Sequence, residues 1–392
     1  MVNPIAFHWA QTPRIVFGAG SIRTLGSSCT NFGDKVLVLT GSSSLVNSSH
    51  WEGITYQFRQ EKCVMAHAII AREPNPKMID NIVSTYRSEK ISCVVAIGGG
   101  SVLDAGKAVS AMLKHPEPVK RYLEGVGDKQ PKGKKLPFIA VPTTAGTGSE
   151  GTKNAVLSEV GTDGFKKSLR HDAFVPNLAL IDPELMLSCP PELTASSGMD
   201  AFTQLLEAYV STKRSGMTDA LAWEGLQYLA QGLEKAYHDG TDLQARSHMA
   251  YAALLSGIAL ANAGLGVVHG FASSIGGRID IPHGTLCGTL MGIANRITLK
   301  KLLDQNPHSE VVKKYAAVGQ LFSQEENRFG MYYANALIDL MEEYTYDFSL
   351  PRLSKFGLRE GDISQIVSNT GQKNHPVELT TTEMELILRR RL

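Results

Sequence analysis

The sequence predicts a protein of two parts, an α/β domain with a parallel sheet (residues 1–188) followed by an all-helical domain (residues 189–392). Three observations lead to this fold class. Short apolar runs dominate the first half, and each ends at Gly, Pro or Thr. Segments with helix-spaced apolar residues separate some of these runs. From about Leu193 onward, the pattern becomes helical almost throughout.

The apolar runs of the first half are expected to be buried strands. Each is apolar over most of its length, which is typical of a strand covered on both faces. The segment 76–90 lies between two of them and carries apolar residues at helical spacing. Strands that alternate with helices favour a parallel sheet. The strands are expected at 35–40, 91–100, 136–144 and 178–183.

Three long helical segments open the second half, at 194–211, 217–240 and 243–264. Ser and Thr residues at the start of the first segment are candidate helix caps, and Gly240 is a stop signal for the second. Three prolines in the stretch 183–193 place the domain boundary near residues 184–192. A cleft between two such domains is where a small ligand usually binds.

Composition narrows the classes of function. The chain has 392 residues, of which 43% are hydrophobic and 20% are charged, and its formal net charge is +1. These values are typical of a globular protein and argue against a nucleic-acid, membrane or acidic partner. Residues 1–18 lack a basic-then-apolar secretion signal, and no apolar run is long enough to span a membrane.

The cysteines indicate the cellular compartment. Five are present, at positions 29, 63, 93, 189 and 287, and none belongs to a Cys-x-x-Cys motif. This odd, scattered set predicts neither a disulfide framework nor a cysteine zinc site. We therefore expect a protein of the reducing cytoplasm.

Of the first two glycine-rich segments, 18–26 and 97–108, only the second is a strong candidate phosphate site. The segment 18–26 begins Gly-x-Gly, but Arg23 breaks the dinucleotide fingerprint, which leaves a strand-to-helix turn or a peripheral part of a cofactor site. The segment 97–108 directly follows an apolar run and opens a helical one. Backbone N–H groups at such a glycine-rich helix start form an anion site. A plain tight turn is the alternative.

The segment 97–108 is not a P-loop. Five residues separate Gly100 from Gly106, and Lys107 is followed by Ala108, which has no hydroxyl for magnesium. Asp104 is expected either to brace the helix start or to face the ligand.

The third glycine-rich segment, 142–156, follows a predicted strand and formally matches Gly-x-Gly-x-x-Gly from Gly146 to Gly151. The match is weak, because the acid expected about twenty residues on is Asp172, which follows no strand-like run. The dense hydroxyl groups from Thr143 to Ser149 suit contacts to a ribose or a pyrophosphate. A plain loop is the alternative.

A candidate metal site is formed by residues far apart in the sequence. His269 and His283 each precede a glycine, which leaves room for the imidazole to enter a pocket. Asp200 and Gln204 are four residues apart and share one helix face. Two imidazoles and a carboxylate can hold a divalent metal with an open position for substrate. Helix capping by Asp200 and core histidines is the alternative that spacing alone leaves open.

A series of longer motifs resembles the iron-containing (group III) alcohol dehydrogenases. In order, they are TPRIVFGAGSI, EPNP, GGGSVLDAGKA, PTTAGTGSE, GMDA, VHGFA and IPHG, and the similarity extends from about Pro13 to the C-terminal segment. The resemblance implies a dehydroquinate-synthase-like fold with a Rossmann-like N-terminal domain. It also implies NAD(P)-dependent oxidation of a small alcohol or reduction of an aldehyde, and a homodimer or larger assembly.

The resemblance further implies a set of site residues. The cofactor contacts would be Gly98, Gly99, Gly100 and Ser101 at the pyrophosphate, Thr143, Thr144, Thr147, Asn154 and Lys166 along the adenosine and nicotinamide, and Asn75 nearby. A zinc or iron ion would be held at Asp200, Gln204, His269 and His283. The metal would act as a Lewis acid during hydride transfer, and Glu207 would be a structural partner.

Two positions depart from the family pattern. Gln204 and Ser273 both stand where the family usually has histidine. An amide oxygen at position 204 disfavours a nitrogen-preferring metal, iron in particular. Zinc on Asp200, His269 and His283 with water, or a partly empty site, is expected instead. Proton exchange with solvent would then use Ser273, the cofactor ribose or water.

A third departure concerns the cofactor. The family often has Asp after the strand 35–40, where it repels a ribose 2′-phosphate, whereas this chain has Gly41. The hydroxyls of Ser42 and Ser43 can accept a phosphate. We therefore expect NADP(H) to be tolerated and consider it a candidate for the preferred cofactor.

Two rival functions remain at this point. The first is a glycerol-phosphate dehydrogenase or a sugar-phosphate cyclase of the same fold, because basic groups for a phosphate are available. These are Lys153, Lys166, Lys167, Arg170 and His171. The second is a cofactor-binding protein that has lost catalysis, as the departures at Gln204 and Ser273 would allow.

Overall fold

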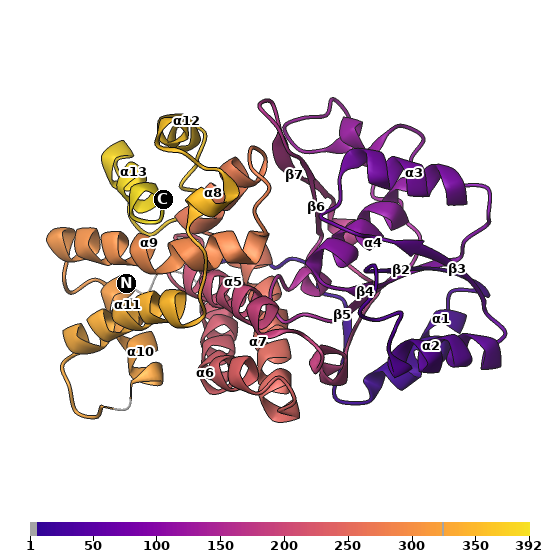
Figure 1. Ribbon diagram of the computed structural model, residues 1–392, viewed down its shortest axis with the longest axis horizontal. Coiled ribbons are helices and arrows are strands. Elements are labelled where there is room, and N and C mark those ends of the chain that lie inside the picture. Colours follow the sequence, from indigo (N-terminus) through magenta and orange to yellow (C-terminus); the bar gives the residue numbers. More distant parts are fainter. Residues whose placement is uncertain (1–5, 324) are drawn as a thin grey trace.

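A six-stranded parallel sheet forms the centre of the N-terminal part. The computed structural model describes residues 6–323 and 325–392, so the first five residues, for which we expect no secretion signal, lie outside it. The strand order is β1-β8-β5-β4-β2-β3, and every pairing is parallel (Figure 1). The strands are β1 (Arg14–Phe17), β2 (Lys35–Thr40), β3 (Val64–Ile69), β4 (Cys93–Gly98), β5 (Phe138–Pro142) and β8 (Leu178–Ile181).

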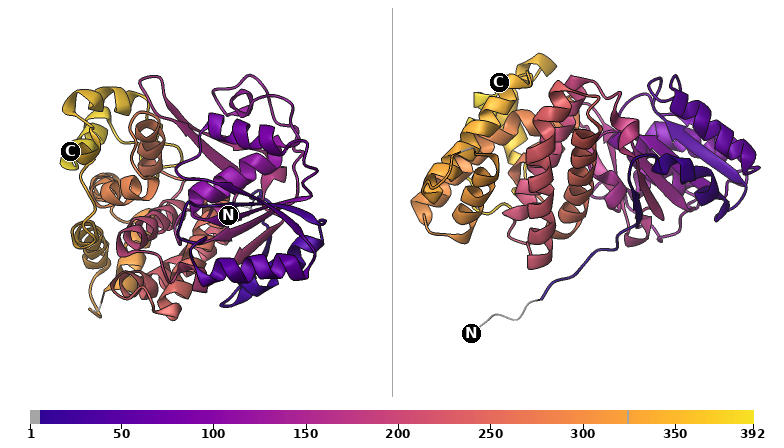
Figure 2. Two further views of the ribbon diagram at one scale, coloured as in Figure 1. Left: turned by 45° about the vertical axis from the view of Figure 1, so that its right-hand side comes forward. Right: turned by 90° about the horizontal axis from the view of Figure 1, so that it is seen from below.

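Helices cover both faces of this sheet (Figure 2). Helices α3 (Pro76–Tyr86) and α4 (Gly100–Met112) share one apolar core with alternate strand residues such as Leu37 and Val94. Helices α1 (Leu25–Thr30) and α2 (Ser49–Gln60) share a second core with the intervening residues, such as Val36 and Val95. Alternate side chains of a strand point to opposite faces, so strands covered on both sides must be apolar throughout.

The strand order reverses between β2 and β4. Strand β2 pairs with β3 on one side and with β4 on the other. In open parallel sheets, such a reversal leaves a crevice at the carboxyl ends of the strands, where ligands bind. Here those ends lead into Gly41 after β2, Gly99 after β4 and Thr143 after β5, and Gly98 lies directly opposite Pro142. Two of the glycine-rich segments therefore leave neighbouring strands at one edge.

An antiparallel hairpin lies between the sheet and the helical part. Its strands are β6 (Asn154–Glu159) and β7 (Phe165–Arg170). Strand β7 contacts helix α8 (Val267–Gly276) of the helical part, and β6 contacts α4 of the sheet part. The hairpin therefore forms one wall of the space between the two parts (Figure 1).

The C-terminal part consists of helices around one apolar core. The expected order of a parallel α/β sheet followed by helices is confirmed, while the division at residue 188 stays a prediction. The longer helices are α5 (Pro191–Tyr209), α6 (Gly216–His238), α7 (Leu243–Ala263), α9 (His283–Gln305), α10 (Glu310–Phe322) and α11 (Gly330–Asp347), and the shorter ones are α8, α12 (Ile363–Ser368) and α13 (Thr381–Arg390).

No single helix within residues 6–323 and 325–392 has the length and apolar composition to cross a membrane, although α7 and α8 meet these limits when taken together across their 94° bend.

The start of α5 differs from the expected one. Pro190 is its N-cap and makes no side-chain cap, and Pro191 begins the helix. Thr194, Ser196 and Ser197, which we considered as caps, lie inside α5 instead. Proline is favoured at the first helical position because its φ already suits the helix and its missing N–H has no intrahelical partner there.

Two glycines hold the third glycine-rich segment against the helical part. Gly148 has φ +59°, and a Cβ added to it would lie 2.5 Å from the backbone of Gly257 on α7. A Cβ added to Gly257 would lie 2.1 Å from the carbonyl oxygen of Gly148. On its other side, the segment places Thr147 where a Cβ of Gly100 would be, at 2.7 Å. Glycine is required at 148 and 257 because their backbones are in contact, and at 100 because the Thr147 side chain occupies the place of a Cβ.

The space around two helical glycines, Gly257 in α7 and Gly53 in α2, predicts that replacing them by alanine changes the free energy of unfolding in opposite directions. Gly257→Ala should lower the free energy of unfolding by about 1–3 kcal/mol, because overpacking forces the backbones apart. Gly53→Ala in α2 meets no atom within 4 Å and should raise it by up to about 1 kcal/mol, since alanine is the better helix former. Urea denaturation of both variants tests this, and an unchanged midpoint for Gly257→Ala would contradict it.

Candidate active site

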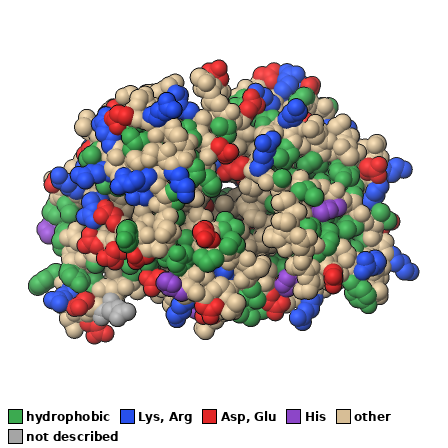
Figure 3. Space-filling view, viewed as in Figure 1, with side chains coloured by type: hydrophobic (Ala, Val, Ile, Leu, Met, Phe, Trp, Pro, Cys, Tyr) green, Lys and Arg blue, Asp and Glu red, His purple; other side chains and the backbone are tan. Residues whose placement is uncertain are grey.

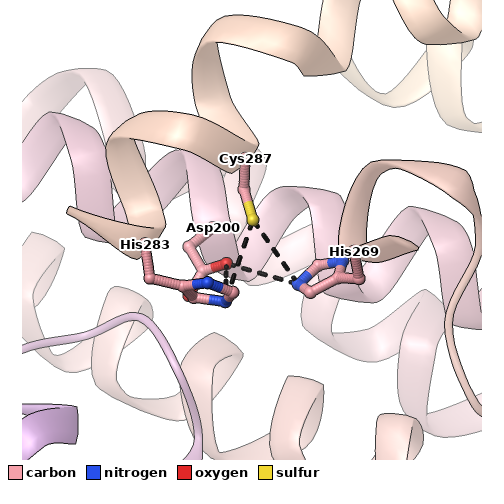
Figure 4. Close-up of side chains that lie close together, drawn as sticks. All are labelled: Asp200, His269, His283 and Cys287. Carbon is pink, nitrogen blue, oxygen red and sulfur yellow. Dashed lines mark hydrogen bonds and ion pairs between the residues drawn. The ribbon is translucent and has the colours of Figure 1, made fainter. Parts of the chain in front are cut away.

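The candidate site lies where α5, α8 and the start of α9 meet (Figure 4). Helix α5 is almost entirely buried and contributes Asp200, Gln204 and Glu207. Helix α8 contributes His269, and α9 begins at His283. Three of the four residues predicted as metal ligands, Asp200, His269 and His283, therefore have donor atoms close together. A fourth donor, Cys287, lies one turn after His283 on α9.

These four side chains direct their donor atoms toward one point (Figure 4). The donor atoms all lie within 4.8 Å of one another. Asp200 Oδ1 is 3.5 Å from His269 Nε2 and 3.6 Å from His283 Nε2. Cys287 Sγ is 3.7 Å from His269 Nε2 and 3.8 Å from His283 Nε2. The arrangement therefore has the shape of a small cage.

The cage fits a tetrahedral divalent metal. Zinc bonds of about 2.1 Å to oxygen and nitrogen and about 2.3 Å to sulfur imply separations of about 3.4 Å between oxygen and nitrogen and about 3.6 Å between sulfur and nitrogen. The observed separations agree with these values within a few tenths of an ångström. Asp200 Oδ1 is also buried without a hydrogen-bond partner among the described residues. A buried carboxylate oxygen without a partner is costly unless a cation is bound.

Glu207 orients one imidazole of the cage. Its Oε2 accepts a hydrogen bond of 2.7 Å from His269 Nδ1, and its Oε1 accepts one of 2.8 Å from the backbone N–H of Val268. With Nδ1 as the donor, the lone pair of His269 is on Nε2 and faces Asp200. A carboxylate behind a ligating histidine sets its tautomer and raises its basicity. Glu207 thus has a positioning role, as its expected structural function suggests.

The electrostatics of the cage differ between its donors. Burial lowers the pKa of His269, but the adjacent Cys287, Asp200 and Glu207 outweigh this and raise it well above its ordinary value, so a metal displaces a proton there. Burial raises the pKa of Asp200, but the adjacent His283 and His269 outweigh this and lower it to about 2, so the carboxylate is ionised. Burial lowers the pKa of His283, which keeps a lone pair available near neutral pH. Burial raises the pKa of Cys287 to about 11. A bound cation reverses this last effect, because coordination deprotonates a thiol.

Gln204, the fourth residue expected at the metal, makes two hydrogen bonds through its amide. Its Nε2 donates to Asp200 Oδ2 at 3.2 Å, and its Oε1 accepts from Ser256 Oγ at 2.9 Å. The amide oxygen, the only atom that could bind a metal, is therefore engaged by α7. In this position, Gln204 holds the second oxygen of Asp200 so that Oδ1 faces the two imidazoles.

Sequence reasoning missed Cys287. We had considered the cysteines only as Cys-x-x-Cys pairs and judged a cysteine zinc site not to be expected. The available signal was the spacing of His283 and Cys287, which are four residues apart and hence on one helix face. All five cysteines are free thiols, as expected without a disulfide framework.

A cavity of about 230 Å³ joins the cage to the glycine-rich segments. It brings together several predicted cofactor residues: Gly100, Ser101, Asp104, Thr147, Asn154 and Lys166. Gln204, His269 and His283 line its inner end. Gly41 and Ser101 line a further hollow beyond it, at the strand-order reversal. The predicted cofactor path is thus continuous from the sheet edge to the cage.

Other predicted residues have structural roles. Asn75 caps α3, because its side chain accepts from the N–H of Met78 at 2.9 Å. Asp104 accepts from Ser149 Oγ and from the N–H of Val156, so it braces the loop as well as lining the cavity. Lys107 is buried and donates to backbone and hydroxyl oxygens of 149–154, unlike a P-loop lysine.

The remaining predicted cofactor residues lie where the loops after β4 and β5 meet. The N–H of Thr143 donates to Gly98 O at 3.0 Å. A Cβ added to Gly99 would lie 3.3 Å from Thr144 Oγ1.

Comparison with known proteins decides the family. Residues 12–183 match the family described as iron-containing alcohol dehydrogenase, and residues 194–392 match the C-terminal region of the same family. The chain belongs to the iron-containing alcohol dehydrogenase family. The resemblance found in the sequence is thereby confirmed, and alcohol dehydrogenase activity follows from this membership.

Individual members of the iron-containing alcohol dehydrogenase family match over most of their length. Long-chain-alcohol dehydrogenase 1 of Geobacillus thermodenitrificans is 31% identical, with 92% of this chain and 90% of that protein covered. The 1,3-propanediol dehydrogenase of Klebsiella pneumoniae is 32% identical, with 88% and 87% covered. The crystal structure of a 1,3-propanediol oxidoreductase superposes with a TM-score of 0.86 at 29% identity and covers 99% of this chain and 100% of that one.

For this alcohol dehydrogenase, the hydrogen bond to His269 predicts that Glu207→Gln weakens zinc binding by about 10- to 100-fold, as loss of a carboxylate behind a ligating histidine does. Glu192→Gln, on the exposed first turn of the same helix, is the matched control and should leave the affinity unchanged. Competition of the apoprotein with a chromophoric chelator gives both dissociation constants. Equal affinities of the two variants would remove the positioning role of Glu207.

Proposed function

We propose that this protein interconverts a primary alcohol and its aldehyde with a nicotinamide cofactor and a divalent metal. The observation that carries the proposal is the cage of Asp200, His269, His283 and Cys287 at the inner end of a cavity that begins at the glycine-rich helix start. When bound, the metal supplies a Lewis acid for the alcohol oxygen, and the nicotinamide exchanges the hydride.

The chain itself supplies position and exclusion of water. The three helices of the cage hold their donors in the buried core, and Glu207 and Gln204 set the orientation of His269 and Asp200. The N–H groups at the start of α4, with Gly99 as its N-cap, are available for the cofactor phosphates. Ser273 Oγ donates to the His269 carbonyl at 3.0 Å and lines the same cavity, so it is placed to pass a proton toward solvent.

We further propose that Cys287, not Gln204, is the fourth metal ligand. Two contacts support this choice. Cys287 Sγ lies within 3.8 Å of both imidazole Nε2 atoms, whereas the Gln204 oxygen accepts from Ser256. A thiolate, two imidazoles and a carboxylate form a donor set that would hold zinc, which would supply Lewis acidity to the alcohol oxygen. The cysteine thus compensates for the histidine missing at position 204.

Cobalt(II) substitution tests this ligand set without relying on turnover. The cobalt protein should show a near-ultraviolet thiolate-to-metal charge-transfer band, which Cys287→Ser removes and Gln204→Ala retains. Cys189→Ser, at a free cysteine outside the cage, is the matched control and should keep the band. A band that survives Cys287→Ser would overturn thiolate ligation, and failure of the unaltered protein to bind any divalent metal would overturn the metal role.

We also propose that the cofactor site accepts a ribose 2′-phosphate. The hollow after β2 is lined by Gly41, Ser42 and Ser43, with glycine at the expected repelling position, and by Arg72. Its one carboxylate, Glu73, is paired with Lys166 at 2.7 Å. A guanidinium beside hydroxyl groups suits a phosphate dianion.

The Arg72 guanidinium predicts a selective effect on NADPH. Arg72→Ala should raise KM for NADPH by about tenfold, which corresponds to about 1.4 kcal/mol, and should leave KM for NADH nearly unchanged. Arg59→Ala, at an exposed arginine of α2, is the control and should change neither. Initial rates with both cofactors provide the measurement, and strict use of NADH by the unaltered protein would contradict the proposal.

We further propose that the protein forms a homodimer and is located in the cytoplasm. The edge strand β1 leaves Ile15 and Phe17 more than a third exposed, at 39% and 38%, on a side of the sheet with no further strand among the described residues. An open, apolar edge of this kind favours pairing with a second copy. Five free cysteines agree with a reducing compartment.

A further inference from the structure

A second cavity, of about 560 Å³, opens directly from the first. Asn154, Lys166, Ser273 and Lys373 line both, so the two form one continuous space that passes the cage. The glycine-rich helix start 98–101 contributes to the first cavity and not to the second. The second cavity therefore extends beyond the glycine-rich helix start, past the predicted cofactor contacts Asn154 and Lys166, on the side where the far end of a substrate would lie.

The walls of this second cavity are strongly cationic. Six basic side chains line it, together with a single acid, Glu124: Lys153, Lys166, Lys167, Arg170, Lys213 and Lys373. Four of the five basic residues expected to serve a phosphate, Lys153, Lys166, Lys167 and Arg170, thus line this cavity. The fifth, His171, follows β7, and its ring accepts from the N–H of Ala173. Figure 3 shows the molecular face hollowed between the two parts, with Lys and Arg side chains near its upper edge.

Half of these cations are already neutralised. Lys166 pairs with Glu73 at 2.7 Å, Lys153 pairs with Asp172, and Arg170 pairs with Glu124. The other three form no ion pair with any described carboxylate. They are Lys167, Lys213 and Lys373. A cavity with three uncompensated ammonium groups has a positive potential that concentrates anions.

Lys373 connects this charge to the reacting centre. Its Nζ lies 3.5 Å from the carbonyl oxygen of His269 and 3.4 Å from Ser273 Oγ. Its backbone has φ 48°, in the left-handed region that a lysine rarely adopts. The surrounding structure therefore holds an ammonium group beside the very residue whose imidazole belongs to the cage. Lys373 and the imidazoles of His269 and His283 line the same first cavity.

We propose that the substrate is a short alcohol or aldehyde with an oxyanion at its far end, a carboxylate, sulfonate or phosphonate. The proposal rests on the function proposed above and names its substrate class. The reacting carbon lies at the cage, and the oxyanion lies in the second cavity among Lys373, Lys167 and Lys213, with amide donors from Asn154 and Asn374 on the same wall. Ammonium and amide N–H groups donate to oxyanions of all three kinds.

The test is a panel of aldehydes of matched length that end in methyl, hydroxyl, carboxylate, sulfonate or phosphonate. At least one anionic member should exceed the methyl-terminated member in kcat/KM by tenfold or more, and the preferred head group identifies the class. This advantage should shrink as sodium chloride is raised from low to about 0.5 M, because salt screens exposed charges. Inorganic phosphate or sulfate should inhibit competitively against the preferred aldehyde.

Variants assign the effect to this cavity. Lys373→Gln and Lys213→Gln should each lower the ratio of anionic to neutral kcat/KM by about five- to tenfold, mainly through KM. Lys213 lies outside the cavity that holds the cage, so its effect cannot arise from a disturbed metal site. Lys355→Gln, at an exposed lysine elsewhere, is the control and should leave the ratio unchanged.

The possible failures are distinguishable. If no aldehyde of any kind is reduced by the metal-loaded protein, the proposed function fails. If neutral aldehydes are reduced as well as anionic ones, and the lysine variants leave the ratio unchanged, the function stands and the oxyanion site is wrong.

Discussion

The buried carboxylate of Asp200 is the constraint around which the helical part is organised. A charge in the middle of a core helix is tolerated only when partners surround it. One oxygen receives the amide of Gln204, and the other faces two imidazoles and a thiol. His269 comes from α8, His283 and Cys287 come from α9, and Gln204 is held by Ser256 of α7. The packing of α5, α7, α8 and α9 is therefore inseparable from the geometry of the site.

A second constraint joins this core to the sheet. The segment 143–149 passes between the start of α4 and the middle of α7. Gly148 and Gly257 permit backbone contact with α7, and Gly100 leaves room for the Thr147 side chain. The buried ammonium of Lys107 holds the same segment from the side of the sheet. The spacing between the nucleotide-binding edge and the cage is thus set by backbone atoms in contact, which is how two separate parts keep a hydride donor and acceptor in register.

The departures from the family pattern form a coherent set. Loss of histidine at position 204 leaves an amide that supports Asp200, and Cys287 supplies a donor one turn from His283. At position 273, where the resemblance implies a histidine, Ser273 accepts a hydrogen bond of 3.4 Å from Lys373 Nζ. Both changes alter the chemistry of the site and leave its scaffold intact, as expected where function resides in side chains on a common fold.

The sequence by itself determined the fold class, the family and three members of the cage, because apolar periodicity and local motifs carry that information within short stretches. The edge strand β3 and the hairpin β6–β7 escaped notice, since their partly exposed residues lack a continuous apolar run. Only the tertiary structure decided that Cys287 faces the cage, that Gln204 turns its oxygen toward Ser256, and that Lys373 stands near the lysines of β7. These relations depend on how helices distant in sequence rotate against one another, and no local pattern encodes that rotation.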